Sequence, residues 1–152
     1  STDATGTSAR FNFPSGITTD GTNLYVADSY NNRIRKIVIS TGVVTTLAGS
    51  SAGSTDHNTG TSASFNIPWG ITTDGTNLYV ADSSTGYQPY YNKIRKIVIS
   101  TGVVTTLAGS TNGTTDHTTG TSAKFFYPRG ITTDGTNLYV SDTGNHRIRK
   151  IQ

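Results

Sequence analysis

The sequence contains no cysteine, no methionine and no glutamate, and charged residues make up only 14% of its 152 positions. The absence of cysteine excludes disulfide bonds, zinc–thiolate sites and thiol catalysis. No apolar run approaches the ~18 residues of a membrane-spanning helix, so no membrane span is expected. Because glutamate and methionine are missing, few strong helix formers remain, which excludes a helical bundle.

The residues present in quantity are small and polar: 29 threonines, 17 glycines and 16 serines. Threonine, valine, isoleucine and tyrosine favour strands, and glycine, serine and asparagine favour turns. The composition therefore predicts an all-β fold. It is also typical of bacterial surface or secreted repeat proteins, so we expect a secreted or cell-surface location. The net charge of +3 indicates only a weak preference for anionic partners.

Internal repetition dominates the sequence. The decapeptide ITTDGTNLYV occurs at 17–26, 71–80 and 131–140, and a run of seventeen residues at 34–50 recurs unchanged at 94–110. Repeats this similar indicate either recent duplication or a designed sequence. The first two repeats contain four short strand-like segments and the third contains three; in the first repeat they lie at 16–19, 23–27, 33–39 and 43–48. Four meandering strands in a unit of 40–60 residues are typical of a propeller blade, with a β-sandwich as the alternative.

Three segments of the repeat resemble a known family. Pro-x-Gly-Ile-Thr-Thr-Asp, Leu-Tyr-Val-Ala-Asp and the Asn-His-Arg-Ile-Arg-Lys-Ile of 145–151 are similar to NHL repeats, over nearly the whole chain. The resemblance implies a β-propeller, which in this family usually has six blades. We therefore expect residues 1–152 to form a three-bladed NHL unit of four-stranded antiparallel blades, at about 10–48, 64–108 and 124–152. The third blade should lack its outer strand.

Three blades cannot close a ring, and an open arc would expose the apolar flanks of its two end blades. The chain is then either part of a longer propeller or one half of a two-chain ring. We predict a homodimer with two-fold symmetry that completes a six-bladed ring.

Differences between the repeats fall on one face of the predicted blades. In a four-stranded meander, the links from strand two to three and from blade to blade share one face, which we call the variable face. Binding residues concentrate on variable loops held by a rigid scaffold. The candidate binding residues are Trp69, Arg129, Ser15, Arg10, Lys124, Tyr87, Tyr90 and Tyr91. The alternative is that these aromatic side chains only cover blade edges.

Two sets of polar residues invite a catalytic interpretation and do not sustain it. Acidic and basic residues flank the turn between strands two and three in every repeat, which favours structural salt bridges over a catalytic pair. The pairs are Asp28 with Arg33, Asp82 with Lys93, and Asp142 with Arg147. His57 and His117 occupy equivalent loops without a third ligand, whereas zinc needs three protein ligands. We expect no catalysis, no metal and no cofactor.

The leading hypothesis is a non-enzymatic recognition or scaffold propeller that presents its variable face to a protein, peptide or glycan. One alternative is RNA binding through a basic variable face, which the thin basic patch disfavours. Another is a duplicated or engineered repeat protein with no ligand beyond self-assembly.

Overall fold

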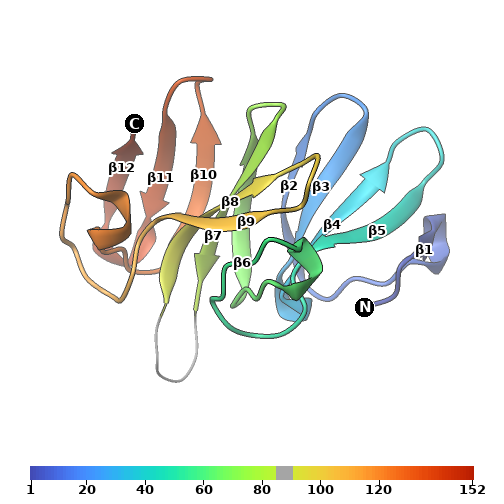
Figure 1. The fold of residues 1–152 in the computed structure, drawn as a ribbon, viewed down its shortest axis with the longest axis horizontal. Coiled ribbons are helices and arrows are strands. Elements are labelled where there is room, and N and C mark those ends of the chain that lie inside the picture. Colours follow the sequence, from blue (N-terminus) through green and yellow to red (C-terminus); the bar gives the residue numbers. More distant parts are fainter. Residues whose placement is uncertain (85–90) are drawn as a thin grey trace.

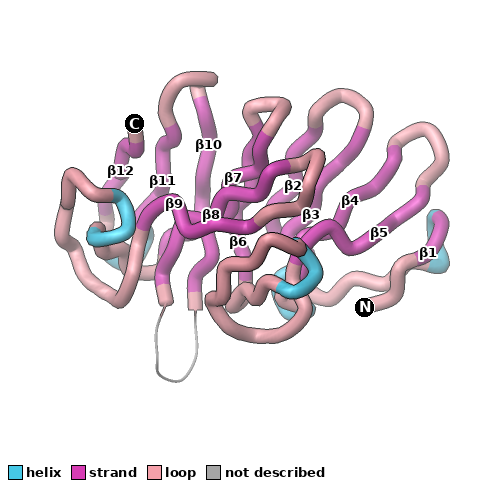
Figure 2. The backbone as a smooth tube through the Cα atoms, viewed as in Figure 1, coloured by secondary structure: helices cyan, strands magenta, loops and turns pink. Residues whose placement is uncertain are grey.

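The computed structural model describes residues 1–84 and 91–152. It contains twelve strands in three antiparallel sheets, and the all-β prediction is confirmed (Figure 1). The helical segments in the described ranges are single 3-10 turns, drawn cyan in Figure 2. Among these residues no helix is long and apolar enough to cross a membrane.

The three sheets follow one another along the chain, and each is a meander. The first sheet has the order β1-β5-β4-β3-β2, the second β6-β7-β8-β9 and the third β10-β11-β12. The first consists of β1 (Ala4–Thr5), β2 (Pro14–Thr19), β3 (Asn23–Asp28), β4 (Arg33–Val38) and β5 (Val43–Ala48). The second consists of β6 (Pro68–Thr73), β7 (Asn77–Ser83), β8 (Asn92–Val98) and β9 (Val104–Ala108). The third consists of β10 (Pro128–Thr133), β11 (Leu138–Asp142) and β12 (Arg147–Ile151). The 3-10 turns are η1 (Gly6–Ser8), η2 (Ser29–Asn31), η3 (Gly60–Ser62), η4 (Gly120–Ser122) and η5 (Thr143–Asn145).

The third sheet has three strands, as expected, and β12 forms its outer edge. The polar N-terminal segment does not reach this edge. Instead its β1 pairs antiparallel with β5, with Ala4 opposite Val44, so it widens the first sheet.

An aspartate organises the turn after the first long strand of each sheet. The Asp20 carboxylate accepts hydrogen bonds from the backbone N–H groups of Thr22 (2.9 Å) and Asn23 (2.7 Å), and from the Tyr25 hydroxyl (2.7 Å). Gly21 adopts φ +88°, a backbone conformation that residues other than glycine rarely take. The same turn recurs at Asp74 and Asp134, which explains why Asp-Gly predicts these hairpins.

The core lies between neighbouring sheets rather than within one. Ile34 and Ala48 of the first sheet pack with Leu78 and Val80 of the second and with Phe65 of the loop that precedes it. An equivalent cluster joins the second and third sheets through Ile94, Phe125 and Val140. Each sheet therefore needs a neighbour on each side to bury both of its faces.

Glycine permits the close approach of the innermost strands β2, β6 and β10, which lie side by side (Figure 1). A Cβ atom on Gly16 would lie 2.5 Å from the Trp69 carbonyl oxygen, and one on Gly70 would lie 2.3 Å from that of Arg129. Both distances are far inside van der Waals contact, so only glycine fits at these two positions.

The outward faces of the two end sheets are exposed and apolar. Ile17 of the first sheet and Ile39, directly after β4, are 60% and 51% exposed, and Ile148 of the third sheet is 74% exposed. The residues equivalent to Ile148 are Ile34 and Ile94, which are fully buried against the next sheet. These end faces thus carry core residues that the described chain leaves uncovered.

Candidate functional site

A buried arginine joins each sheet to the loop that precedes it. In the second sheet, Arg95 forms ion pairs with Asp82 (2.9 Å) and Asp56 (2.8 Å), and its guanidinium lies 5.0 Å from the centre of the Phe65 ring. Arg35 and Arg149 occupy equivalent cages in the first and third sheets. Both terminal nitrogens of each arginine meet fixed carbonyl and carboxylate oxygens, whereas the buried Nε atoms of Arg35 and Arg95 have no partner among the described residues. Because the charged ends are held on all sides, the cages are structural.

The predicted turn pairs need correction. Arg33, Lys93 and Arg147 lie directly opposite the three aspartates in strand register, but the carboxylates pair with the arginines two residues further along. A long side chain can reach its diagonal neighbour across an antiparallel pair of strands. The diagonal arginines are buried, whereas the residues directly opposite the aspartates are not. Arg33 instead donates to the Ser1 hydroxyl.

Burial has an electrostatic effect in the middle cage. Loss of solvent raises the pKa of Asp82 to about 6, although Arg95 acts in the opposite direction. The Lys93 pKa is lowered, first by burial and then by repulsion from Arg95, while Asp56 and Asp82 oppose that shift. Lys93 lines an open pocket, but Asp82 is buried and held by Arg95, so the Asp82 shift reflects packing and not preparation for catalysis.

The variable face is one edge of the arc of sheets. Figure 1 shows the turn from β3 to β4 and the long loop from β5 to β6 at the lower edge, with the β2–β3 and β4–β5 turns at the upper edge. The lower edge in this view is therefore the variable face. The described residues that gather there come from η2, from the segments preceding each proline, and from the first residues of β2, β6 and β10.

Trp69 and Arg129 lie together at the inner part of this face, as the sequence suggests. The Arg129 guanidinium carbon is 4.9 Å from the centre of the Trp69 ring, a cation–π distance. The Ser15 hydroxyl donates to the Trp69 carbonyl oxygen (2.8 Å), so Ser15 contributes to the joint between the first two sheets. The indole N–H of Trp69 is buried without a hydrogen-bond partner among the described residues.

Two exposed aromatic residues extend this group and were not among the predicted site residues. Phe13 and Tyr30 are 54% and 53% exposed, and their rings stack at 4.7 Å. Phe13 also meets Trp69 edge to face at 6.0 Å. Tyr30, Phe13, Trp69 and Arg129 thus form a continuous row, which we call the aromatic row. Phe13 occupies a position that varies between repeats, and that variation was the signal available in the sequence.

The backbone at Phe13 is strained in a way that recurs in all three repeats. Phe13, Ile67 and Tyr127 each precede a proline and adopt φ values of 53°, 57° and 50°. Such values are unfavourable for bulky residues. Bonds from the neighbouring sheet hold two of them: the N–H of Ile67 donates to Asn32 (2.9 Å) and that of Tyr127 to Asn92 (3.2 Å). Strain of this kind often marks a functional surface.

The other predicted binding residues do not join the aromatic row. Arg10 donates to its own loop at the Thr7 and Ala9 carbonyl oxygens, and the aliphatic stem of Lys124 packs against Gly113. Their own carbonyl oxygens accept bonds from Arg35 and Arg149. The Tyr91 ring lies 5.4 Å from the Lys93 ammonium group. Tyr87 and Tyr90 lie outside the described residues.

The loop histidines have local roles. The Nδ1 atoms of His57 and His117 accept hydrogen bonds from the backbone N–H groups of Thr59 (2.9 Å) and Thr119 (3.0 Å). Within residues 1–84 and 91–152, no three histidine or acidic side chains converge as a metal site would require.

Comparisons with known proteins agree with the repeat pattern. The NHL repeat model matches residues 11–37 and 125–151. Human NHL repeat-containing protein 2 is 36% identical over 141 residues, which cover 83% of this chain and 18% of that protein. The chain therefore spans about a fifth of the curated relative.

Solved structures show the same fold. An auxiliary nutrient binding protein from Bacteroides thetaiotaomicron superposes with a TM-score of 0.74 at 22% identity, over 90% of this chain and 36% of that one. Virginiamycin B lyase from Staphylococcus aureus gives a TM-score of 0.60 at 22% identity, over 97% of this chain and 41% of that one. Identities this low relate the folds and not the activities. The chain therefore carries NHL repeats, folded into the antiparallel sheets of a β-propeller.

Proposed function

We propose that this chain is a non-enzymatic recognition and scaffold unit, which binds a protein, peptide or glycan at the aromatic row. In this proposal residues 1–152 supply three blades of an NHL propeller, and two copies pair about a two-fold axis to form a six-bladed ring. The observation that carries the binding role is the exposed, stacked row of Tyr30, Phe13, Trp69 and Arg129.

Several properties of the aromatic row support binding. Stacked aromatic side chains that remain half exposed present a large apolar area with little side-chain entropy left to lose. The strained backbone at Phe13 fixes one of these rings in advance. Flat apolar rings beside a guanidinium suit the faces of sugar rings, or the aromatic and acidic side chains of a peptide.

The charged groups support recognition rather than catalysis. The carboxylates of Asp28, Asp82 and Asp142 are buried in the arginine cages, and those of Asp20, Asp74 and Asp134 are bound within turns. A catalytic acid or base needs access to substrate. One structural neighbour is named as a binding protein and another as a lyase, so the fold accommodates both roles. The choice between binding and catalysis therefore rests on the side chains of this chain, whose named aspartates are buried or bound within turns.

RNA binding is the second candidate, and one contact favours it. The pair of Trp69 and Arg129 could stack against an unpaired base. However, Arg10 folds back on its own loop and Lys124 packs against Gly113, so the basic groups do not form a continuous track for phosphates. This arrangement favours a protein, peptide or glycan.

The end faces support pairing of two copies. At each joint inside the chain, an isoleucine from one sheet packs against the next: Ile34 on the second sheet and Ile94 on the third. Ile148 would fill the same position against the first sheet of a second copy, where Ile17 and Ile39 are exposed. Gly130 fits the same scheme, because a Cβ there would meet only the Ser141 side chain of its own sheet, whereas a Cβ on Gly16 or Gly70 would meet the backbone of the next sheet.

The binding role is tested with peptide and glycan arrays probed by the purified chain. Tyr30→Ala should weaken binding by at least tenfold, because truncating an aromatic anchor typically costs about 2 kcal/mol. The matched control is Tyr30→Phe, which keeps the stacked ring and should bind as the parent does. Equal binding by the parent and the alanine variant would overturn the assignment of the site. Salt-sensitive binding to single-stranded RNA, with no array hit, would favour the second candidate.

A further inference from the structure

A pocket on the outer part of the second sheet lies apart from the aromatic row and includes one predicted binding residue, Tyr91. Its volume is about 360 Å³. Every residue that lines it belongs to the second sheet, directly precedes β8, or lies in the loop from the second sheet to the third. The aromatic and polar side chains of the lining are Tyr91, Lys93, Thr106, Ser110, Thr111 and Thr121.

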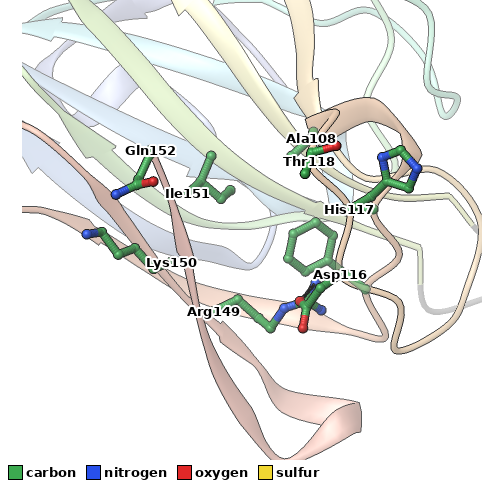
Figure 3. Close-up of a pocket in the computed structure, with 11 residues that line it drawn as sticks. Ala108, Asp116, His117, Thr118, Arg149, Lys150, Ile151 and Gln152 are labelled. Carbon is green, nitrogen blue, oxygen red and sulfur yellow. Dashed lines mark ion pairs between the residues drawn. The ribbon is translucent and has the colours of Figure 1, made fainter.

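Backbone contacts hold the walls of this pocket in place. The N–H of Asn92 donates to the Ser110 carbonyl oxygen (3.2 Å), which ties the start of β8 to the loop after β9. A Cβ on Gly109 would lie 2.2 Å from the Asn92 carbonyl oxygen, so only glycine permits this approach. Figure 3 shows the same loop further along, where Asp116 lies beside Arg149 of the third sheet. The loop is therefore anchored to both sheets, and the pocket exists without a ligand.

The hydroxyl groups of the lining offer both acceptors and donors. A hydroxyl has one donor hydrogen and two acceptor lone pairs. The Thr106 hydroxyl donates to a carboxylate (2.9 Å) and the Ser110 hydroxyl to a backbone carbonyl oxygen (3.1 Å), so both oxygens remain as acceptors. Thr111 and Thr121 are exposed. A ligand with several hydroxyl groups of its own matches such a mixed lining.

Lys93 and Tyr91 add a cationic donor and an aromatic ring. The Lys93 ammonium group bonds to Ser54, at 3.1 Å to the carbonyl oxygen and 3.5 Å to the hydroxyl. Since an ammonium group has three hydrogens, at least one is left for a ligand. The ammonium nitrogen lies 5.4 Å from the centre of the Tyr91 ring, so the donor and the apolar surface adjoin each other.

The charges beside the pocket balance one another. The two cations are Lys93 and Arg95, and the two anions that act on them are Asp56 and Asp82. A set of groups without net charge has little long-range attraction for phosphate or sulfate. The pocket therefore favours a neutral ligand.

The first sheet contains an equivalent pocket without the aromatic ring. Four of its lining residues are Arg33, Thr46, Ser50 and Thr61, at the positions of Lys93, Thr106, Ser110 and Thr121. The residue at the position of Tyr91 is Asn31, whose amide donates to the Asp28 carboxylate (2.9 and 3.0 Å). The cation and the hydroxyls thus belong to the repeat, whereas the ring distinguishes the pocket of the second sheet.

We propose that the pocket beside Tyr91 and Lys93 binds one neutral pyranose unit of a glycan. The C–H face of the sugar packs on the Tyr91 ring, a sugar hydroxyl accepts a hydrogen bond from Lys93, and other sugar hydroxyls bond to the threonines of the lining. The volume lies at the small end of the range for small-molecule pockets, which suits a single sugar. The site is separate from the aromatic row and does not depend on the role proposed there.

The test titrates the purified, nitrogen-15-labelled chain with the methyl α-pyranosides of glucose, mannose and galactose, followed by two-dimensional NMR. At least one should bind saturably, with a dissociation constant on the order of 1–10 mM for so small a ligand. Binding should shift the amide signals of residues 91–93 and 109–111. Tyr91→Ala should weaken binding at least ~5-fold, because the stacking surface is lost. Tyr91→Phe keeps the ring and should bind as the parent does.

A second pair of variants tests the cationic donor. Lys93→Met should weaken binding at least ~5-fold, since a hydrogen bond from a charged group is lost. Lys96→Met is the matched control, because Lys96 lies on the opposite face of the same strand and does not line the pocket. Four results would overturn the proposal: no saturable binding of any glycoside up to ~100 mM, equal affinity of the parent and Tyr91→Ala, amide shifts confined to the aromatic row, or tighter binding of inorganic phosphate than of the glycosides.

Discussion

Substitution of Ile148 by serine should separate the two copies of the proposed ring without unfolding either one. Ile148 is 74% exposed in the single chain, so its own sheet gains little from it. In the ring it would be buried as Ile34 and Ile94 are, both of which have no exposed surface.

The size of the effect follows from the area that pairing would bury. Complete burial of an isoleucine stabilises by about 2 kcal/mol, so covering 74% of Ile148 contributes about 1.5 kcal/mol. A ring with two-fold symmetry contains this contact twice, which gives about 3 kcal/mol. The dimer dissociation constant of Ile148→Ser should therefore rise roughly 100-fold.

Analytical ultracentrifugation over a range of concentrations measures this directly. The parent chain should sediment at twice its mass of 16.1 kDa, and Ile148→Ser should shift to the single-chain mass as it is diluted. Tyr30→Ser, which removes an exposed aromatic side chain on the variable face, is the control and should remain paired. A parent chain that sediments at 16.1 kDa throughout, or an Ile148→Ser chain as tightly paired as the parent, would refute the reasoning.

Three further predictions concern stability. The first concerns Asp74, whose pKa is raised by burial and lowered by hydrogen bonds from Asn77 and Thr76. The net result is a pKa of about 2, below the usual 3.8. The ionised turn therefore stabilises the fold above about pH 4 and loses this effect as the pH falls through 2. Asp74→Asn should flatten that part of the acid-unfolding curve measured by circular dichroism. Arg95→Met leaves Asp82 buried without its cation, and should cost about 3–5 kcal/mol in chemical denaturation. Because Arg95 lowers the Asp82 pKa, its removal raises that pKa above 6, so the loss should shrink as the pH falls toward 6 and Asp82 takes up a proton in the variant. A loss that is independent of pH would contradict this. Gly70→Ala places a Cβ 2.3 Å from the Arg129 carbonyl oxygen and should cost about 1–3 kcal/mol in the same assay. An unchanged denaturation midpoint would show that β6 and β10 can move apart without loss of stability.

The strands and hairpins could be predicted from the sequence because their signals are local. Asp20–Gly21 marks a hairpin wherever it occurs, since the carboxylate and the glycine satisfy the turn without help from distant residues. The partner of Asp28 could not be predicted in the same way. Sequence spacing selects Arg33, which is opposite in register, but burial against the Phe11 ring selects Arg35.

The site was predictable only in part, for a related reason. Trp69 and Arg129 stand at one variable position in successive repeats, so their contact follows from the repeat itself. The positive φ of Phe13 and Ile67 has no local signal, because bulky residues avoid that region. A bond from Asn32 of one sheet fixes Ile67 of the next, and such contacts between sheets appear only once the sheets are assembled.

The arginine cages also define where one structural unit ends and the next begins. Asp56 lies in the loop between the first and second sheets, yet it bonds to Arg95 and Thr106 of the second. The cooperative unit is therefore a loop together with the sheet that follows it, and it is offset from the repeat that the strands alone suggest. A cut or fusion point near residue 51 would leave every cage whole, whereas one near residue 63 would separate an aspartate from its arginine. A segment exchanged between such proteins should therefore begin with the loop and end with the sheet that follows it, so that each aspartate stays with its arginine and the segment can fold independently.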